Sequence, residues 1–133
     1  RTHIKENSLF NTPPVFAIYV TLLTLRWIKE QGLATIEANN KAKADLLYHA
    51  IDTNPLFKGT VATEDRSWMN VNFIMENRDL EPEFLAFAKA NQCVGLAGHR
   101  SVGGMRASLY NALPLSSVQH LVDLMNAFAQ QKG

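Results

Sequence analysis

The sequence predicts an α+β domain in which a short, mostly antiparallel sheet is covered by helices. Residues 69–73 and 105–109 alternate apolar with polar side chains, a period of two that is typical of half-buried strands. Residues 115–131 instead repeat apolar side chains at the spacing of one helical face. The connection between Leu96 and Met105 is short, which favours antiparallel pairing of the strands on either side.

The first long helix is predicted over residues 13–31. Thr12 is expected to act as its N-cap, because Pro13 suits the first helical position, where no N–H is needed. Gly32 is expected to end the helix. Residues 15–23 are apolar on every face of this helix. Complete burial is typical of such a helix, so we expect a second domain or subunit to cover it.

A second helix is predicted over residues 33–52 and is ended by Asn54-Pro55. Its apolar stripe comprises Ile36, Ala44, Leu47 and Ile51. Lys41 and Lys43 fall largely outside this stripe, so both amines are expected to face solvent.

The remaining elements are expected to be short. Residues 1–10 are expected to be irregular. Strands are predicted at residues 57–61, 69–73, 93–96 and 105–109, helices at 82–91 and 115–131, a turn at 76–79 and a loop at 98–104.

Composition excludes several classes of protein. The length of 133 residues predicts one domain, and the 19% of charged residues is below the usual value of about 25%. This shortage suggests that part of the surface is normally covered.

A formal net charge of +1 argues against nucleic acid as a partner. Cys93 stands alone, so no intramolecular disulfide and no multi-cysteine zinc site is expected. The longest uncharged apolar run has 13 residues, whereas a membrane helix needs about 20. We therefore expect a soluble, cytoplasmic protein.

The most distinctive segment is residues 98–106, Gly-His-Arg-Ser-Val-Gly-Gly-Met-Arg. No acidic residue occurs between Glu83 and Asp123, so its positive charge is not locally compensated. Arg106 is expected to begin a strand, where a rigid backbone could hold its planar fork against a carboxylate or phosphate. His99 and Arg100 lie on the loop and could bind a second anion. The alternative is that these side chains pair with acids elsewhere or face water.

Asn11 and Thr12 form a second candidate anion site, because a helix N-terminus presents free N–H groups and partial positive charge. The alternative is an ordinary N-cap. Other candidates are weaker. The remaining histidines, His3, His49 and His120, show no metal-ligand spacing, and no metal site is expected. Cys93 is expected to pack in the core.

Three blocks of sequence carry a family resemblance. In order along the chain they are Leu-Phe-Asn-Thr-Pro-Pro at 9–14, Ser-Trp-Met-Asn-Val-Asn-Phe at 67–73, and Gly-His-Arg-Ser-Val-Gly-Gly-Met-Arg-Ala-Ser-Leu-Tyr-Asn-Ala-Leu-Pro-Leu at 98–115. Together they resemble the C-terminal part of the phosphoserine aminotransferases, which belong to class V of the fold-type-I enzymes that use pyridoxal 5′-phosphate.

The resemblance implies a small C-terminal domain at residues 13–133, preceded by residues 1–12 leaving a large N-terminal domain. Members of the family are homodimers. They exchange an amino group between glutamate and 3-phosphohydroxypyruvate, which gives O-phosphoserine and 2-oxoglutarate for serine biosynthesis. Bacterial members also serve pyridoxine biosynthesis. The large domain is absent from these residues and so is its Schiff-base lysine, so we expect no catalytic residue in this chain and no activity of the chain alone.

Individual residues match positions with known roles in the family. By this resemblance, Asn11 and Thr12 would bind the phosphate of the cofactor held by the other subunit. Arg106 would bind the substrate α-carboxylate, and His99 and Arg100 would contact the substrate's phosphate or distal carboxylate. Two other interpretations stay open: a class V aminotransferase for a different acidic substrate, and a free-standing α+β module that binds a small dianion. The second of these would leave the apolar helix at residues 15–23 without a covering partner.

Overall fold

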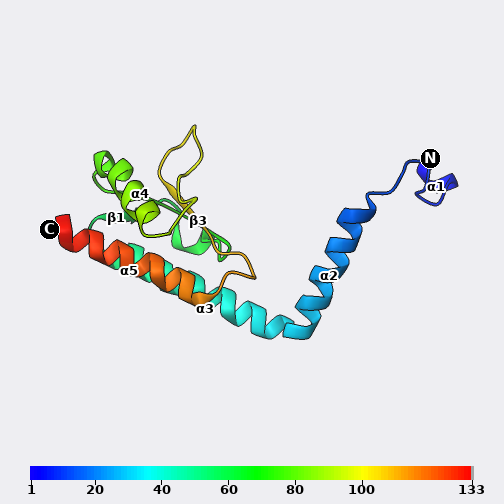
Figure 1. Cartoon of the computed structure of the whole chain (residues 1–133), viewed down its shortest axis with the longest axis horizontal. Coiled ribbons are helices and arrows are strands. Elements are labelled where there is room, and N and C mark those ends of the chain that lie inside the picture. Colours follow the sequence, from blue (N-terminus) through cyan, green and yellow to red (C-terminus); the bar gives the residue numbers. More distant parts are fainter. Residues whose placement is uncertain (133) are drawn as a thin grey trace. The chain divides into compact units, whose positions relative to one another are not determined.

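The structure, a computed structural model, describes residues 1–132 and divides into two compact units, residues 1–36 and the remainder of the chain (Figure 1). The first unit holds α1 (Thr2–Lys5), α2 (Val15–Gln31) and the start of α3 (Leu33–Thr53). The expectation that residues 1–10 are irregular is therefore wrong at α1, which forms a single helical turn.

The helix α2 begins later than expected and has no side-chain cap. Its N-cap is Pro14, so the prediction that Thr12 caps it is wrong. Two adjacent prolines explain the difference. A proline disfavours the helical conformation of the residue before it, which keeps Pro13 out of the helix. Pro14 also has no N–H for a Thr12 side chain to cap. At the other end Gly32 stops the helix as predicted, at a φ of 84°.

The second unit contains the sheet. Its elements after α3 are β1 (Phe57–Gly59), a 3₁₀ turn (Thr63–Asp65), β2 (Asn70–Met75), a 3₁₀ turn (Arg78–Leu80), α4 (Glu81–Ala90), β3 (Met105–Ser108) and α5 (Leu115–Lys132). The predicted α+β class and most elements are confirmed. The strand predicted at 93–96 is wrong. Gly95 has a φ of 79° there, which bends the chain out of an extended course, and only a single bridge, Ala97 to Met105, forms.

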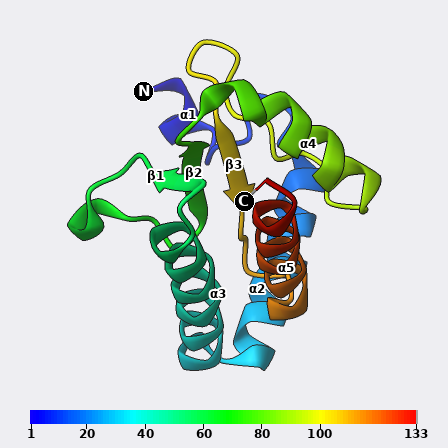
Figure 2. The same cartoon turned by 90° about the vertical axis from the view of Figure 1, so that its left-hand side faces the viewer.

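The three strands are antiparallel in the order β1-β2-β3, and Figure 2 shows them side by side. Burial alternates along β2 and β3, so the helices of the second unit cover only one face of the sheet. The covered face includes Phe73 and Met105, which are paired across the two strands. Asn72 and Arg106 are also paired, and both are exposed on the other face. We call this second side, which includes Asn72, Arg106 and Ser108, the open face.

Aromatic side chains from three elements meet in the core. Phe84 of α4 contacts Phe57 of β1 and Phe128 of α5 edge to face, with ring centroids 5.0 and 5.3 Å apart. The other fully buried large side chains include Leu47, Ile51, Phe73, Met75, Met105, Leu109 and Met125. This core supports β3 from the covered side.

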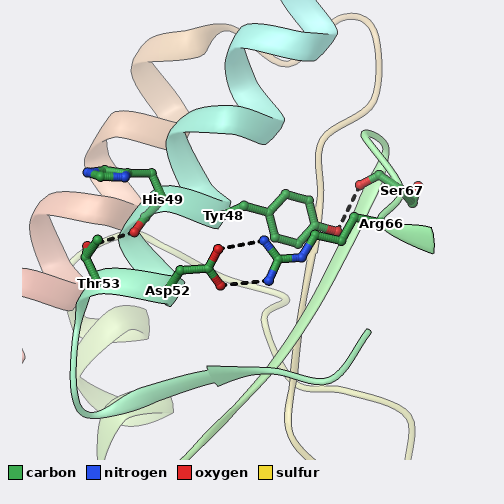
Figure 3. Close-up of polar contacts among 6 residues, drawn as sticks. All are labelled: Tyr48, His49, Asp52, Thr53, Arg66 and Ser67. Carbon is green, nitrogen blue, oxygen red and sulfur yellow. Dashed lines mark hydrogen bonds and ion pairs between the residues drawn. The ribbon is translucent and has the colours of Figure 1, made fainter. Parts of the chain in front are cut away.

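A polar cluster joins the last turns of α3 to the connection between β1 and β2 (Figure 3). The Arg66 guanidinium donates to both carboxylate oxygens of Asp52, at 2.6 and 2.7 Å. It also lies 4.5 Å from the centroid of the Tyr48 ring, and the Tyr48 hydroxyl donates to the Ser67 carbonyl at 3.0 Å. Sequence patterns did not indicate this cluster, because its members come from two different elements, α3 and the connection after β1, that meet only in the folded chain.

Replacing Asp52 with asparagine is expected to destabilise the chain at neutral pH but not in acid. The hydrogen bonds from Arg66 lower the pKa of Asp52. Stability from a carboxylate whose pKa is lowered on folding is present above its unfolded-state pKa and is lost as pH falls through the folded-state pKa. We expect a loss of about 1 kcal/mol at pH 7, since the carboxylate is half exposed. Urea unfolding between pH 7 and pH 2 measures it.

The matched control is Asp45→Asn, which removes an exposed carboxylate that pairs with Lys41 on the same helix. This change is expected to cost less than about 0.5 kcal/mol. A difference between Asp52→Asn and the unmodified chain that does not shrink as the pH falls would contradict the prediction.

Candidate functional site

The loop at residues 98–104 is closed by its own backbone. The Gly98 N–H donates to the Gly104 carbonyl at 2.9 Å, and the Gly103 N–H donates to the His99 carbonyl at 2.8 Å. A side chain at Gly98 does not fit, since its Cβ would lie 2.2 Å from the Gly103 carbonyl oxygen. The loop therefore has a defined shape. Its predicted end before Met105 is confirmed, whereas its predicted start at Gly98 is wrong, because the irregular connection begins after Ala90.

His99 is oriented by its neighbour in the loop. Its Nδ1 lies 2.7 Å from the Ser101 hydroxyl oxygen and accepts a hydrogen bond from the Ser101 N–H at 3.3 Å. Because a backbone N–H can only donate, Nδ1 is an acceptor, and the neutral imidazole carries its proton on Nε2. The exposed ring thus presents Nε2–H as a hydrogen-bond donor to an anion.

Arg106 lies on β3, close to its start, as the sequence predicts. Its backbone is held on both sides, by pairing with Asn72 of β2 and by a hydrogen bond from its own N–H to the Leu96 carbonyl at 2.7 Å. Its side chain belongs to the open face. A rigid backbone therefore supports an exposed guanidinium.

Neither Arg100 nor Arg106 has an acidic partner. The ion pairs among residues 1–132 join Lys41 to Asp45, Lys58 to Glu76, Arg66 to Asp52, Arg78 to Glu81 and Lys132 to Glu83. Both arginines are exposed, and the acid-free stretch around them holds no carboxylate. Of the interpretations left open by the sequence, pairing with acids elsewhere is therefore excluded for the described residues. Both guanidinium groups are available to an external anion.

A pocket of about 520 Å³ adjoins Arg106. It is lined by residues 92–96, by β3 and by the start of α5. Cys93 borders it, and burial raises the pKa of this thiol, which disfavours the reactive thiolate. The His120 side chain also borders it, with Nε2 donating to the Asn91 carbonyl at 2.8 Å. These two residues therefore have packing and hydrogen-bonding roles, and Arg106 borders the same pocket from β3.

Asn11 and Thr12 precede α2 in the first unit, where both are exposed. Within residues 1–132 neither side chain makes a hydrogen bond, and the first turn of α2 has no side-chain cap. Free donors are thus present at this helix start. The geometry of the second unit brings His99, Arg100 and Arg106 onto one loop and the strand that follows it, while Asn11 and Thr12 are described by themselves.

Lys43 lies in the interior, against the expectation from the sequence pattern. Only 1% of it is exposed, so the expectation that its amine faces solvent is wrong. Its Nζ donates to the carbonyls of Leu109 and Tyr110, at 3.0 and 2.9 Å, and burial lowers its pKa. A usable signal exists, because Lys43 lies four residues before Leu47 and seven before Ala50, a spacing that puts all three on one helical face.

Residues 1–132 contain no cluster of three histidine, cysteine, aspartate or glutamate side chains that could hold a metal ion. Over the same residues, no helix has the length and hydrophobicity needed to span a membrane.

Two relatives of the chain carry the same name. Phosphoserine aminotransferase from Flavobacterium johnsoniae is 60% identical over 126 residues, which are 94% of this chain and 35% of that protein. The one from Parabacteroides distasonis is 57% identical over an alignment of 133 positions, which covers 98% of this chain and 38% of that protein. The chain thus spans little more than a third of the length of these relatives.

Solved structures agree with the sequence matches. Phosphoserine aminotransferase from Bacillus circulans subsp. alkalophilus superposes on 99% of this chain and 37% of its own, with a TM-score of 0.92 and 45% identity. The phosphoserine aminotransferase from Trichomonas vaginalis with bound pyridoxal phosphate superposes on 93% of this chain and 36% of its own, with a TM-score of 0.85 and 42% identity. The family described as aminotransferase class-V matches residues 2–121. This chain belongs to the class-V aminotransferase family.

Proposed function

We propose that this chain is the C-terminal part of a phosphoserine aminotransferase that exchanges an amino group between glutamate and 3-phosphohydroxypyruvate. The observation that carries the proposal is the set of unpaired cationic side chains on the 98–104 loop and β3, in a chain 60% identical to a protein of that name. Glutamate and 3-phosphohydroxypyruvate each have two anionic ends, so two separate groups of donors suit both.

Arg106 binds the α-carboxylate that all substrates of this reaction share. Its planar fork donates two parallel hydrogen bonds to a carboxylate, and β3 fixes where the fork begins. His99 and Arg100 bind the distal phosphate or carboxylate, His99 through Nε2–H and Arg100 through its guanidinium. The loop that holds them is defined by backbone hydrogen bonds, which gives the second anion a fixed place relative to the first.

The residues of this chain fit one end of pyridoxal 5′-phosphate. Asn11 and Thr12 have exposed side chains that make no hydrogen bond within residues 1–132, and the uncapped N–H groups of α2 suit a phosphate. When bound, this cofactor acts as an electron sink for the carbon that gains or loses the amino group. Lys43 is not the lysine that binds it covalently, since its amine is buried and donates to two carbonyls. That lysine belongs to the large domain.

The partners of the chain are the large N-terminal domain of the same protein and a second subunit. No side chain of α2 is buried, although the helix is apolar. Val15, Phe16, Ile18 and Leu25 are all more than half exposed. An apolar helix of this kind is stabilised by a covering partner. In this assignment residues 1–12 leave the large domain and residues 13–133 form the small one. The enzyme acts in the cytoplasm, in serine and pyridoxine biosynthesis.

The test is to assay the full-length protein for 2-oxoglutarate formed from glutamate and 3-phosphohydroxypyruvate. We expect turnover by the full-length protein and none by residues 1–133 alone. Replacing the phosphorylated substrate by hydroxypyruvate separates the proposal from a class V enzyme for another acid, because only a phosphate-specific enzyme loses most of its kcat/KM. Turnover by the 133-residue chain, or a full-length protein indifferent to the phosphate, would overturn the assignment.

A further inference from the structure

Lys43 is a buried cation whose hydrogen-bond acceptors among residues 1–132 are backbone carbonyl groups. It is 1% exposed, and none of the ion pairs among residues 1–132 includes it. Its Nζ donates to the carbonyls of Leu109 and Tyr110, which lie 66 and 67 residues further along the chain. A buried charge is costly unless its hydrogen bonds are well made, so this arrangement strongly restricts where the two carbonyls can lie.

Asn40 extends the same attachment by one residue. It is 8% exposed, lies one helical turn before Lys43, and its Nδ2 donates to the side-chain oxygen of Asn111 at 2.8 Å. Two side chains of α3 thus hold three consecutive residues, 109–111. Without the ammonium group, the Leu109 and Tyr110 carbonyl oxygens would face the same buried position without a hydrogen-bond donor, and their dipoles would repel each other. Residues 109–111 would then have to turn.

The held residues are the direct continuation of β3. The Leu109 N–H donates to the Met69 carbonyl at 2.8 Å, which extends the pairing of β2 and β3 by one step beyond Ser108. Arg106 is three residues earlier on the same strand. On the other edge of β3, the Arg106 N–H donates to Leu96, but the neighbouring segment forms only a single bridge there. This edge of β3 therefore gives the strand little support, and Lys43 holds its C-terminal end.

We propose that Lys43 is a positioning residue for Arg106, holding the end of β3 so that the guanidinium on the open face meets a carboxylate at a fixed place. The inference rests on the proposed function, because the carboxylate is the substrate's. Lys43 is not a catalytic residue, since its buried Nζ is bound to two carbonyls and does not reach the open face. A small displacement of a binding group is enough to weaken substrate binding severely.

The test uses Lys43→Met in the full-length protein, which keeps the length of the side chain and removes the donor. We expect the KM for glutamate to rise about 10-fold and kcat to change less than about 3-fold. The visible absorbance of the bound cofactor should stay unchanged. Lys41→Met is the matched control, because Lys41 is exposed on the same helix and forms only a surface ion pair. Its KM should stay within about 2-fold of the unmodified enzyme.

A double-mutant cycle with Arg106→Ala distinguishes positioning from general destabilisation. If Lys43 acts through Arg106, adding Lys43→Met to Arg106→Ala changes the KM no further. The same 10-fold rise in both backgrounds would overturn the inference. If Arg106→Ala alone leaves the KM unchanged, the proposed function fails and the inference fails with it, whereas an effect of Arg106→Ala without one of Lys43→Met rejects the positioning role alone.

A milder variant keeps the test usable if Lys43→Met does not fold. Asn40→Ala removes only the bond to Asn111 and leaves the buried ammonium in place. We expect a KM rise of about 3-fold that also disappears in the Arg106→Ala background. A KM that Asn40→Ala leaves unchanged, in a protein where Lys43→Met does not fold, would overturn the inference.

Discussion

Replacing Arg106 with alanine in the full-length protein is expected to raise the KM for glutamate and for 3-phosphohydroxypyruvate about 100-fold each. This factor corresponds to about 2.7 kcal/mol, which is the size of a lost charge-assisted, two-point hydrogen bond. Both substrates should be affected alike, because both present an α-carboxylate. Steady-state kinetics with each substrate varied in turn measures the change.

The fold should tolerate this substitution. Arg106 has no ion-pair partner among the described residues, and its side chain lies on the face of the sheet that no helix of the second unit covers. Urea unfolding of residues 1–133 should therefore change by less than about 0.5 kcal/mol. Arg106→Lys should recover only part of the affinity, since lysine keeps the charge but loses the fork.

Arg78→Ala is the matched control for removing an exposed arginine. Arg78 lies near the loop, where its guanidinium approaches Gly103, but it pairs with Glu81. The KM values should stay within about 3-fold of the unmodified enzyme. An Arg106→Ala enzyme whose response to glutamate is unchanged would contradict the assignment of the α-carboxylate to Arg106.

Most of the fold could be predicted because periodicity reports which face of an element is buried. The alternation at 69–73 and 105–109 found β2 and β3, and the 3.6-residue pattern found α5 almost to the residue. The errors arose where backbone conformation overrides pattern. Pro14 moved the start of α2 beyond Thr12, and Gly95 bent a segment that is apolar enough to be a strand. Composition at 93–96 is compatible with a strand, but the positive φ is not.

The candidate site could be predicted from uncompensated charge, because an acid-free stretch with two arginines is visible in the sequence itself. The residues that support this site could not be predicted. Lys43 and Asn40 contact residues 66 to 71 positions away, and only the folded chain reveals such contacts. Polarity also misled the interpretation, since a lysine is expected at the surface unless a specific set of acceptors is known. The pairing of Asp52 with Arg66 could not be predicted either, because it too is a contact that only the folded chain reveals.

The open face and the exposed α2 give a physical meaning to the low content of charged residues. No helix of the second unit covers one side of the sheet, and α2, a 17-residue helix, has no buried side chain. Surfaces of this kind are typical of interfaces. Arg106 lies on the open face, and Asn11 and Thr12 precede α2, so the anion site is expected to be completed by residues outside this chain. Substrate binding at this site is therefore expected to depend on how rigidly this chain holds the donors that it contributes.

Replacing Gly98 with alanine tests that dependence most directly. The added Cβ would lie 2.2 Å from the Gly103 carbonyl oxygen and 3.0 Å from that of Gly104. Backbone cannot move aside as a flexible side chain can, so the loop must open and the hydrogen bond from Gly98 to Gly104 is lost. We expect residues 1–133 to lose about 2–3 kcal/mol of unfolding free energy, as overpacking plus one lost hydrogen bond.

The displaced loop should also weaken binding of the distal anion. His99 and Arg100 follow Gly98 directly, and a shift of about 1 Å at such groups can cost up to about 100-fold in rate. We expect the KM for 3-phosphohydroxypyruvate to rise about 30-fold in the full-length Gly98→Ala protein, measured by steady-state kinetics.

Gly95→Ala separates this effect from the mere addition of a methyl group. Its Cβ would meet nothing within 4 Å, so the cost is that of an alanine at a φ of 79°, about 1–2 kcal/mol. The loop at residues 98–104 should keep its shape in this control, and the KM should stay near that of the unmodified enzyme. A Gly98→Ala protein with both unchanged stability and an unchanged KM would contradict the close approach of Gly98 to the Gly103 carbonyl. A stable fold with a raised KM would instead show that the loop can open without disturbing the core, which places the specificity for the distal anion in the loop alone.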